Sequence, residues 1–454
     1  MNKIIFFLAS VIAAVTFASE ASALPLFARQ TGMECAACHF QHFPMLTAFG
    51  RAFKAAGFTM MGAQGKVEGD NLSIPNTLNM AVLTTMGYSR NNSDKAATID
   101  PALNAAGVRT TGDGTVYVPG TNGEFSLFVG GRVSDFAGAL AELGMLNDAG
   151  TGAGLASAKI PMLWEMADGT RAGVVPFTTN GQGASYGYEV LNTGANAVHT
   201  MMFIGGDFNG SVAPVLSAQQ YIGTATQATG VAIVVNNPGY FINLTKFHQV
   251  GPADLGGTAA ALTSTYLRAA GTFDLAGWDT GVGIQNWRGS STTVTFESAD
   301  PFTGIITPGG VGLSDTKATA IDGQMQGQLG KMPVGFYATY ARAPAPSGAN
   351  DNTYNSGGTA TKSSFNLAAE LGVIPEKATV GFGIRRGKSG GSAGSLVAGA
   401  NDSDNALLIE ASYKLAQNML LNLVYTSQSG DFWSAANSAA LGSKQTYINL
   451  ATIF

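Results

Sequence analysis

Apolar and polar side chains alternate one by one along extended stretches of this chain. Between Phe365 and Val373 every second residue is apolar, and the positions between them are small or polar. After a break at Pro375-Glu376-Lys377, apolar residues return at every second position from Val380 to Ile384. A period of two is typical of a β-strand with one apolar face, so these residues predict two strands joined by a tight turn.

The same arrangement recurs, and its turns and loops differ in length. Alternating pairs of strands are predicted again within residues 321–340 and 407–425, and a further alternating strand over residues 267–275 leads into a turn near residues 277–279. Their turns are short, whereas long polar connections separate the pairs at residues 89–124, 343–363 and 388–404. Short turns at one end and long loops at the other are typical of an antiparallel outer-membrane β-barrel. Roughly 380 residues, at about 23 for each strand and its connection, predict about 16 strands.

The end of the chain continues the pattern. Ile448, Leu450 and Phe454 share one face of a predicted last strand, with Asn449 on the other face. We therefore expect this segment to close the barrel.

Composition favours an all-β membrane protein. Charged residues make up only 12% of the chain, against about 25% in an ordinary soluble domain, and glycine contributes 60 residues. No run of eighteen apolar residues follows the N-terminus, so helical membrane spans are not expected. A large soluble β-sandwich or β-solenoid is the alternative, but it does not explain the segregated loop lengths. The net charge of −5 argues against nucleic acid as a partner.

The first residues predict export. Lys3 precedes an apolar run from Ile4 to Phe17, and Ala21-Ser22-Ala23 supplies a small-residue cleavage site. This is the form of a Sec signal peptide over residues 1–23, cleaved before Leu24. A membrane anchor is the alternative, but the run is shorter than the ~20 residues of a spanning helix. Signal and barrel together predict the outer membrane of a Gram-negative cell.

Cys35-Ala36-Ala37-Cys38-His39 is the strongest chemical motif. Two thiols at this spacing followed by histidine form a c-type haem attachment site. The thiols bond the haem vinyl groups as thioethers, and His39 becomes the proximal iron ligand. A local disulfide and half of a zinc site are the alternatives, but zinc needs further ligands. We expect one covalent haem.

A short helix is predicted after the motif. Pro44 suits a first helical turn, and Leu46, Phe49 and Phe53 fall on one stripe. Arg51 and Lys54 are expected to point outward. Arg29 and Arg51 could each pair with a haem propionate or remain solvated.

The distal ligand is left open by the sequence. Met60 or Met61, past the predicted helix, is one choice, and His199 or His248 of the barrel wall is another. His42 lies too close to His39 along the chain to reach the opposite face of the same haem. A five-coordinate iron is the remaining alternative.

The N-terminal stretch resembles a known family. FARQTGMECAACH, from Phe27 to His39, and FP-x-L-x-x-FGR-x-FK, from Phe43 to Lys54, are similar to the N-termini of fused cytochrome–porin proteins. In those proteins a monohaem cytochrome segment precedes an outer-membrane barrel, and the best-known members are outer-membrane iron oxidases. The resemblance is specific over residues 25–60 and architectural elsewhere. Met45 and Ala48 stand where the family has an acid and a proline, which indicates a sister branch and leaves Fe(II) open as the donor.

Together these observations predict a signal peptide (1–23), a helical monohaem cytochrome c segment (24–70) inside the lumen, and a porin-like barrel (71–454). The expected function is electron transfer between an extracellular donor and a periplasmic cytochrome or copper carrier. If the donor is Fe(II), the protein is an Fe(II):cytochrome c oxidoreductase. The alternatives are a diffusion porin whose haem-bearing plug acts as a redox gate, and a haem-based ligand binder. No nucleophile–base arrangement or phosphate loop supports a hydrolase or a transferase.

Overall fold

The structure is a computed structural model. It describes residues 25–70, 72–93, 114–119, 122–145, 154–193, 217–252, 261–295, 298–299, 306–307, 310–348, 350–391, 403–433, 438 and 442–454. The predicted signal peptide and His199 lie outside these residues.

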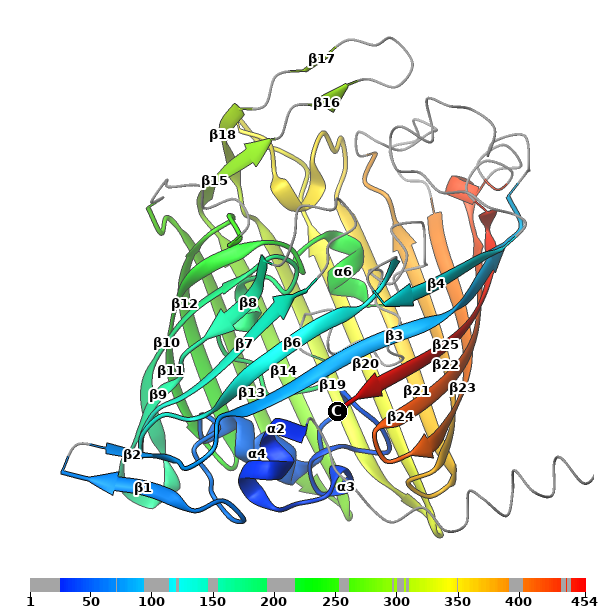
Figure 1. The fold of residues 1–454 in the computed structure, drawn as a ribbon. Coiled ribbons are helices and arrows are strands. Elements are labelled where there is room, and N and C mark those ends of the chain that lie inside the picture. Colours follow the sequence, from blue (N-terminus) through cyan, green and yellow to red (C-terminus); the bar gives the residue numbers. More distant parts are fainter. Residues whose placement is uncertain are drawn as a thin grey trace, which may run out of the picture.

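Antiparallel strands close into a single barrel (Figure 1). Sixteen strands span it in the described part of the chain, if β8 and β9 are counted as one because both pair with β10. The strands are β3 (Asn79–Asn91), β6 (Phe125–Arg132), β7 (Gly138–Gly144), β8 (Gly154–Lys159), β9 (Met162–Glu165), β10 (Arg171–Thr179), β11 (Ala228–Asn237), β12 (Tyr240–His248), β13 (Ser264–Leu275), β14 (Trp278–Arg288), β19 (Ala318–Leu329), β20 (Met332–Ala343), β21 (Lys362–Ile374), β22 (Ala378–Lys388), β23 (Ser403–Ala416), β24 (Met419–Ser429) and β25 (Lys444–Ile453). The predicted strand number is confirmed.

The barrel closes where the sequence predicts. β25 pairs with β3, from Gln445 opposite Asn91 to Ile453 opposite Leu83. The backbone of Phe454 continues the ladder, because it exchanges hydrogen bonds of 2.7 and 3.0 Å with Val82. Two short strands, β4 (Thr115–Pro119) and β5 (Asn122–Gly123), extend the wall beside β3.

The strand faces separate lipid from lumen. Leu367, Phe382 and Ile409 point outward and are 42%, 49% and 48% exposed, whereas Glu370 and Glu410 point inward and are 2% and 5% exposed. A closed barrel with an apolar outer face satisfies all of its backbone hydrogen bonds within the wall, as a membrane requires. In the described residues no helix is long and apolar enough to cross a membrane.

Loop lengths differ between the two ends. Turns of two or three residues join β11 to β12, β13 to β14, β19 to β20 and β21 to β22 at one end. The other end carries the longer connections, including the hairpin of β15 (Ser290–Thr295) and β18 (Gly310–Asp315) with β16 (Ser298–Ala299) and β17 (Ile306–Thr307) beyond it (Figure 1). Single 3-10 turns lie in the connections: η2 (Ala167–Gly169), η3 (Ala184–Tyr186), η5 (Thr353–Asn355) and η6 (Asp431–Trp433). In outer-membrane barrels the short turns face the periplasm.

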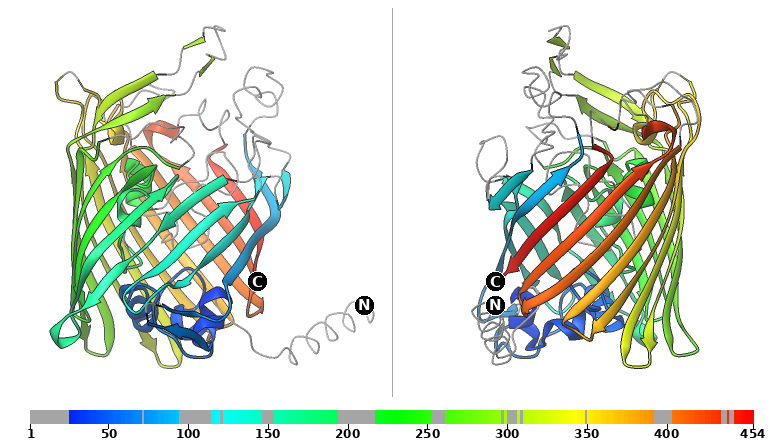
Figure 2. Two further views of the ribbon diagram at one scale, coloured as in Figure 1. Left: turned by 60° about the vertical axis from the view of Figure 1, so that its left-hand side comes forward. Right: turned by 90° about the vertical axis from the view of Figure 1, so that its right-hand side faces the viewer.

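Three helices of the N-terminal segment lie between the strands at the short-turn end: α2 (Pro25–Thr31), α3 (Cys35–Cys38) and α4 (Ala48–Ala55). Figure 2 shows them in blue within the barrel in both views. We call residues 25–62 the plug. The hairpin of β1 (Lys66–Gly69) and β2 (Leu72–Pro75) follows and projects from the same end (Figure 1).

The helix predicted from Pro44 begins later, at Ala48. Thr47 caps it by accepting a hydrogen bond of 3.1 Å from the Gly50 amide. Residues 40–46 instead form a tight loop, in which the Phe40 amide donates to the Met45 carbonyl at 2.9 Å. The sequence prediction of the start was wrong because this loop competes with the first turn.

A second segment folds into the lumen, between β10 and β11. We call residues 180–193 the inner segment; it precedes α6 (Ala218–Ile222), which also lies inside the barrel (Figure 1). Its residues from Ala184 to Leu191 are buried.

Candidate functional site

Helix α3 carries both cysteines on one turn. The Cys35 side chain is buried, its Sγ lies 3.8 Å from the Gln417 carbonyl in the β23–β24 turn, and neither thiol forms a disulfide. Burial raises the pKa of the Cys35 thiol to about 12, so it is uncharged. Among the described residues no three His, Cys, Asp or Glu side chains are grouped so that they could hold a metal ion.

His39 follows directly and is also buried. Its Nδ1 lies 3.1 Å from the Met45 carbonyl, and its ring meets the Phe43 ring edge-on at 5.3 Å. Burial lowers the pKa of His39 to about 4, which favours the neutral ring. A neutral ring that donates from Nδ1 carries its lone pair on Nε2, the nitrogen that a metal needs. Two thiols separated by two residues, and an oriented imidazole directly after the second thiol, fit a covalently attached haem.

The closely packed α3 and α4 require a glycine. A Cβ on Gly50 would lie 2.1 Å from the Cys38 carbonyl oxygen. The Thr47 amide also donates to that oxygen, at 3.0 Å. Gly50 thus allows the helix after the motif to lie directly against the motif.

His42 joins the plug to the barrel wall. Its Nε2 lies 2.9 Å from Glu370 Oε1 on β21, and its Nδ1 lies 2.7 Å from the Phe43 carbonyl. Both ring nitrogens face acceptors, so the ring is an imidazolium. Burial opposes the charge, but the carboxylates of Glu370 and Glu410 outweigh it and raise the pKa of His42 to about 9. Both ring nitrogens of His42 are thus engaged, one by the plug itself and one by the wall.

The two candidate propionate partners have other contacts. Arg51 was expected to point outward, but its guanidinium is buried and lies 2.6 and 2.7 Å from the two carboxylate oxygens of Asp279 on β14. The prediction was wrong because the plug is surrounded by polar wall residues, so a charged helix face also points inward. Lys54 is half-buried, and burial lowers its pKa to about 8. Arg29 donates to the Met80 carbonyl at 2.5 Å.

The distal candidates lie in different places. Met60 and Met61 are half-buried in the plug, and the Met60 carbonyl accepts a hydrogen bond of 2.8 Å from Gln30. His248 ends β12 at the long-loop end, whereas α3 lies at the short-turn end, where Cys35 Sγ is 3.8 Å from the Gln417 carbonyl. The length of β12 therefore separates His248 from the motif.

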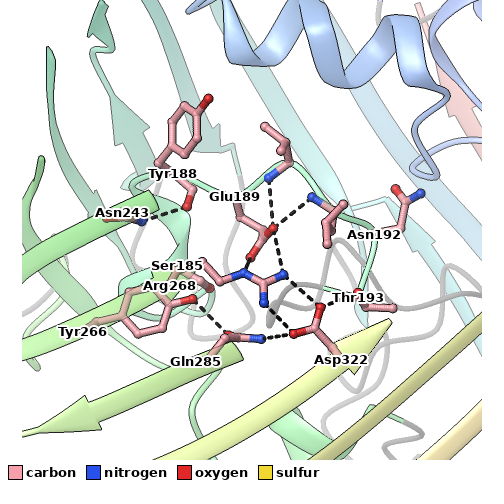
Figure 3. A network of polar contacts seen from close by, with 12 residues as sticks. Ser185, Tyr188, Glu189, Asn192, Thr193, Asn243, Tyr266, Arg268, Gln285 and Asp322 are labelled. Carbon is pink, nitrogen blue, oxygen red and sulfur yellow. Dashed lines mark hydrogen bonds and ion pairs between the residues drawn. The ribbon is translucent and has the colours of Figure 1, made fainter. Parts of the chain in front are cut away.

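A buried ion network holds the inner segment to the wall (Figure 3). Arg268 of β13 lies between Glu189 and Asp322: its Nε is 2.9 Å from Glu189 Oε2, and its Nη2 is 2.8 Å from Asp322 Oδ2. Glu189 also accepts the amides of Val190 and Leu191, at 3.0 and 2.9 Å.

The inner segment also contacts the plug. Asn192 accepts a hydrogen bond from the Leu46 amide at 2.8 Å and donates one to the Leu46 carbonyl at 3.0 Å. The sequence analysis missed Glu189 and Asn192, because they lie in an irregular connection without periodicity. The only local signals are a charged residue, Glu189, within the apolar stretch from Tyr188 to Leu191, and an amide residue, Asn192, directly after it.

In the described residues, a closed wall of sixteen strands and an apolar outer face determine the class of this chain. The chain is a porin-like outer-membrane barrel. What distinguishes this barrel is a plug that carries a Cys-x-x-Cys-His motif inside the lumen.

Comparisons with known proteins concern the barrel alone. No family model matches the chain, and no curated protein matches its sequence. Solved structures with a similar barrel include OprB of Pseudomonas putida (TM-score 0.49, 10% identity, covering 83% of this chain and 94% of that one) and OmpT of Vibrio cholerae (0.46, 9%, 86% and 100%). Salmonella typhi OmpF is another (0.46, 11%, 86% and 100%). Similarity this distant carries nothing about ligands or transported solutes.

Proposed function

We propose that this chain is an outer-membrane electron conduit with one covalent c-type haem on Cys35, Cys38 and His39. The observation that carries the proposal is the position of this donor set on a plug inside the lumen of a membrane barrel. When bound there, the haem supplies a one-electron redox centre. The conduit joins an extracellular reductant to a periplasmic cytochrome or copper carrier, with outer-membrane lipid around the barrel. Met60 or Met61 is the distal ligand that the plug offers.

The need for a centre inside the barrel follows from dimensions. The apolar band of an outer-membrane barrel is about 25 Å tall, which is too wide for one efficient tunnelling step. The motif lies at the short-turn end, which faces the periplasm in such barrels. A periplasmic carrier can therefore approach the motif closely, and an extracellular donor approaches through the lumen.

The plug is attached to the wall by buried polar contacts. Arg51 binds Asp279, His42 binds Glu370, and Gln30 accepts the Arg132 amide at 3.0 Å. A segment tied to three strands does not leave the lumen by thermal motion alone. These ties favour an electron conduit over a diffusion porin with a mobile gate, which is the second candidate.

Fe(II) is the donor that the resemblance to cytochrome–porin proteins suggests, and it would make the chain an Fe(II):cytochrome c oxidoreductase. The decisive experiment expresses the chain with a cytochrome c maturation system and purifies it from outer membranes. We expect one haem per chain by pyridine haemochrome, and reduction of its bands by Fe(II) in a stopped-flow spectrophotometer.

The C35S/C38S variant is the control, and it should assemble as a barrel without covalent haem. A wild-type barrel without haem would overturn the proposal. Haem that Fe(II) never reduces, over a range of pH, would remove Fe(II) as donor and leave the general conduit. Carbon monoxide binding to ferrous wild type would indicate five-coordinate iron and favour the ligand-binding alternative.

A further inference from the structure

We infer that Asn192 is a positioning residue for His39 and thereby sets the redox potential of the site. The inference rests on the proposed function, because it concerns the residue assigned there as the proximal ligand. Asn192 belongs to the inner segment and stands 153 positions away from His39 in the sequence numbering.

Asn192 binds the plug as a neighbouring strand would. Its Oδ1 accepts from the Leu46 amide at 2.8 Å, and its Nδ2 donates to the Leu46 carbonyl at 3.0 Å. One side-chain amide thus satisfies both polar groups of one residue. Among the natural side chains, Asn and Gln carry an acceptor and a donor on one planar group, and Asn is the shorter.

Leu46 is one step from the imidazole of His39. Residues 39 and 46 form an antiparallel bridge, and the Phe40 amide donates to the Met45 carbonyl at 2.9 Å. The same carbonyl lies 3.1 Å from His39 Nδ1. Because Met45 and Leu46 are adjacent, holding the peptide groups of Leu46 also holds the carbonyl that orients His39.

Asn192 is itself held firmly. It is 1% exposed, and its backbone N–H donates to Gln324 Oε1 on β19 at 2.7 Å. The next residue, Thr193, donates to Asp322 Oδ2 at 2.6 Å, and Asp322 binds Arg268 (Figure 3). The barrel wall therefore fixes Asn192, and Asn192 fixes the loop that orients His39.

The expected effect has a defined sign. A hydrogen bond from Nδ1 makes a histidine ligand more basic, which stabilises the ferric state. If the Met45 carbonyl shifts away from His39 Nδ1, the ferrous state becomes more stable relative to the ferric state, and the redox potential rises. A hydrogen bond has a net value that corresponds to about a two- to tenfold change in an equilibrium, so we expect the ferrous-to-ferric ratio at a fixed ambient potential to rise by that factor.

The test compares Asn192→Leu with Asn243→Ala in the full-length haem protein. Asn192→Leu keeps roughly the side-chain volume but removes both hydrogen bonds to Leu46. If the leucine variant does not assemble, Asn192→Ala is used in its place. Asn243 on β12 is the matched control, because its Nδ2 donates at 2.8 Å to the Tyr188 carbonyl of the same inner segment and does not bond Leu46 (Figure 3). Spectroelectrochemical titration gives the redox potentials. Hydrogen exchange of a peptide over residues 40–47 reports whether Asn192 still holds Leu46, and this readout does not depend on haem.

We expect a raised potential and faster exchange in the Asn192 variants, and neither in Asn243→Ala. Equal potentials in wild type and Asn192 variants would overturn the inference while leaving the proposed function intact. An equal shift in Asn243→Ala would also overturn it, since the effect would then be general loosening. A wild-type chain without haem would instead refute the proposed function.

Discussion

At the scale of single residues, backbone carbonyls and one absent side chain shape the proposed haem site. The Met45 carbonyl orients His39, and the Cys38 carbonyl occupies the space that a side chain at position 50 would need. The charged groups of the plug serve the wall instead, as Arg51 and His42 show. The position of the motif residues therefore depends on local backbone contacts, whereas the attachment of the plug to the wall depends on ion pairs.

Gly50→Ala tests the close approach of α3 and α4. The added Cβ would meet the Cys38 oxygen at 2.1 Å, so the helices must separate, at a cost of about 1–3 kcal/mol. We expect less covalent haem per barrel, measured by pyridine haemochrome against total protein. Gly154→Ala is the control, because a Cβ there meets nothing within 4 Å. Equal haem content in the two variants would contradict the account of Gly50.

The charge of His42 gives the plug a pH dependence. Its pKa is raised from 6.5 to about 9 in the folded protein, so its contribution is complete below pH 6.5 and is lost as the pH rises through about 9. The groups that face it are Glu370 and Glu410. We expect hydrogen exchange of residues 40–47, corrected for the intrinsic rate, to accelerate between about pH 7 and 10, because His42 loses its proton in this range. His42→Gln should remove that dependence; a wild-type profile that stays flat would refute the assignment.

At the scale of elements, the plug and the inner segment are folded against each other and against the wall. Neither has the alternating pattern of the strands, and each is held by buried polar contacts. Burying charged groups is costly unless they are paired, so the partners on β13, β14, β19 and β21 decide where these elements lie.

Arg51→Met tests the attachment of α4 to β14. The substitution leaves Asp279 without its buried partner, which we expect to weaken the plug by about 2 kcal/mol. Brief openings should then appear in planar-bilayer recordings. Arg342→Met, at an exposed arginine on β20, is the control and should record like wild type. If Arg51→Met shows no openings in these recordings, other contacts suffice to hold the plug, and the Arg51–Asp279 pair is not needed for its attachment.

At the scale of the whole molecule, the barrel has a complete wall and one end that is filled by the plug. The same wall could serve solute diffusion if its lumen were open, or electron transfer if it is filled. The wall closes through β25 and β3 without any contribution from the plug. A barrel of this class can conduct solutes when its lumen is open. The plug is therefore what converts the porin-like barrel into the proposed conduit.

Deletion of residues 25–62 tests this division. We expect the remaining barrel to assemble, to show the heat-dependent gel shift of a folded barrel, and to conduct small ions that wild type excludes. The C35S/C38S variant keeps the plug and should not conduct. If wild type already conducts as freely as the deletion, the diffusion-porin alternative is the better description.

The sequence by itself determined the barrel and predicted the chemistry proposed for it. Strand alternation, segregated loop lengths and the Cys-x-x-Cys-His motif are local patterns, because a membrane wall demands period two and thioether attachment demands a fixed spacing. Only the tertiary structure decided which residues of the wall and of the inner segment hold the plug. Arg51 with Asp279, His42 with Glu370 and Asn192 with Leu46 are separated by 228, 328 and 146 residues, and no local pattern encodes such pairs. They form because closing the barrel encloses polar groups that must find partners inside it.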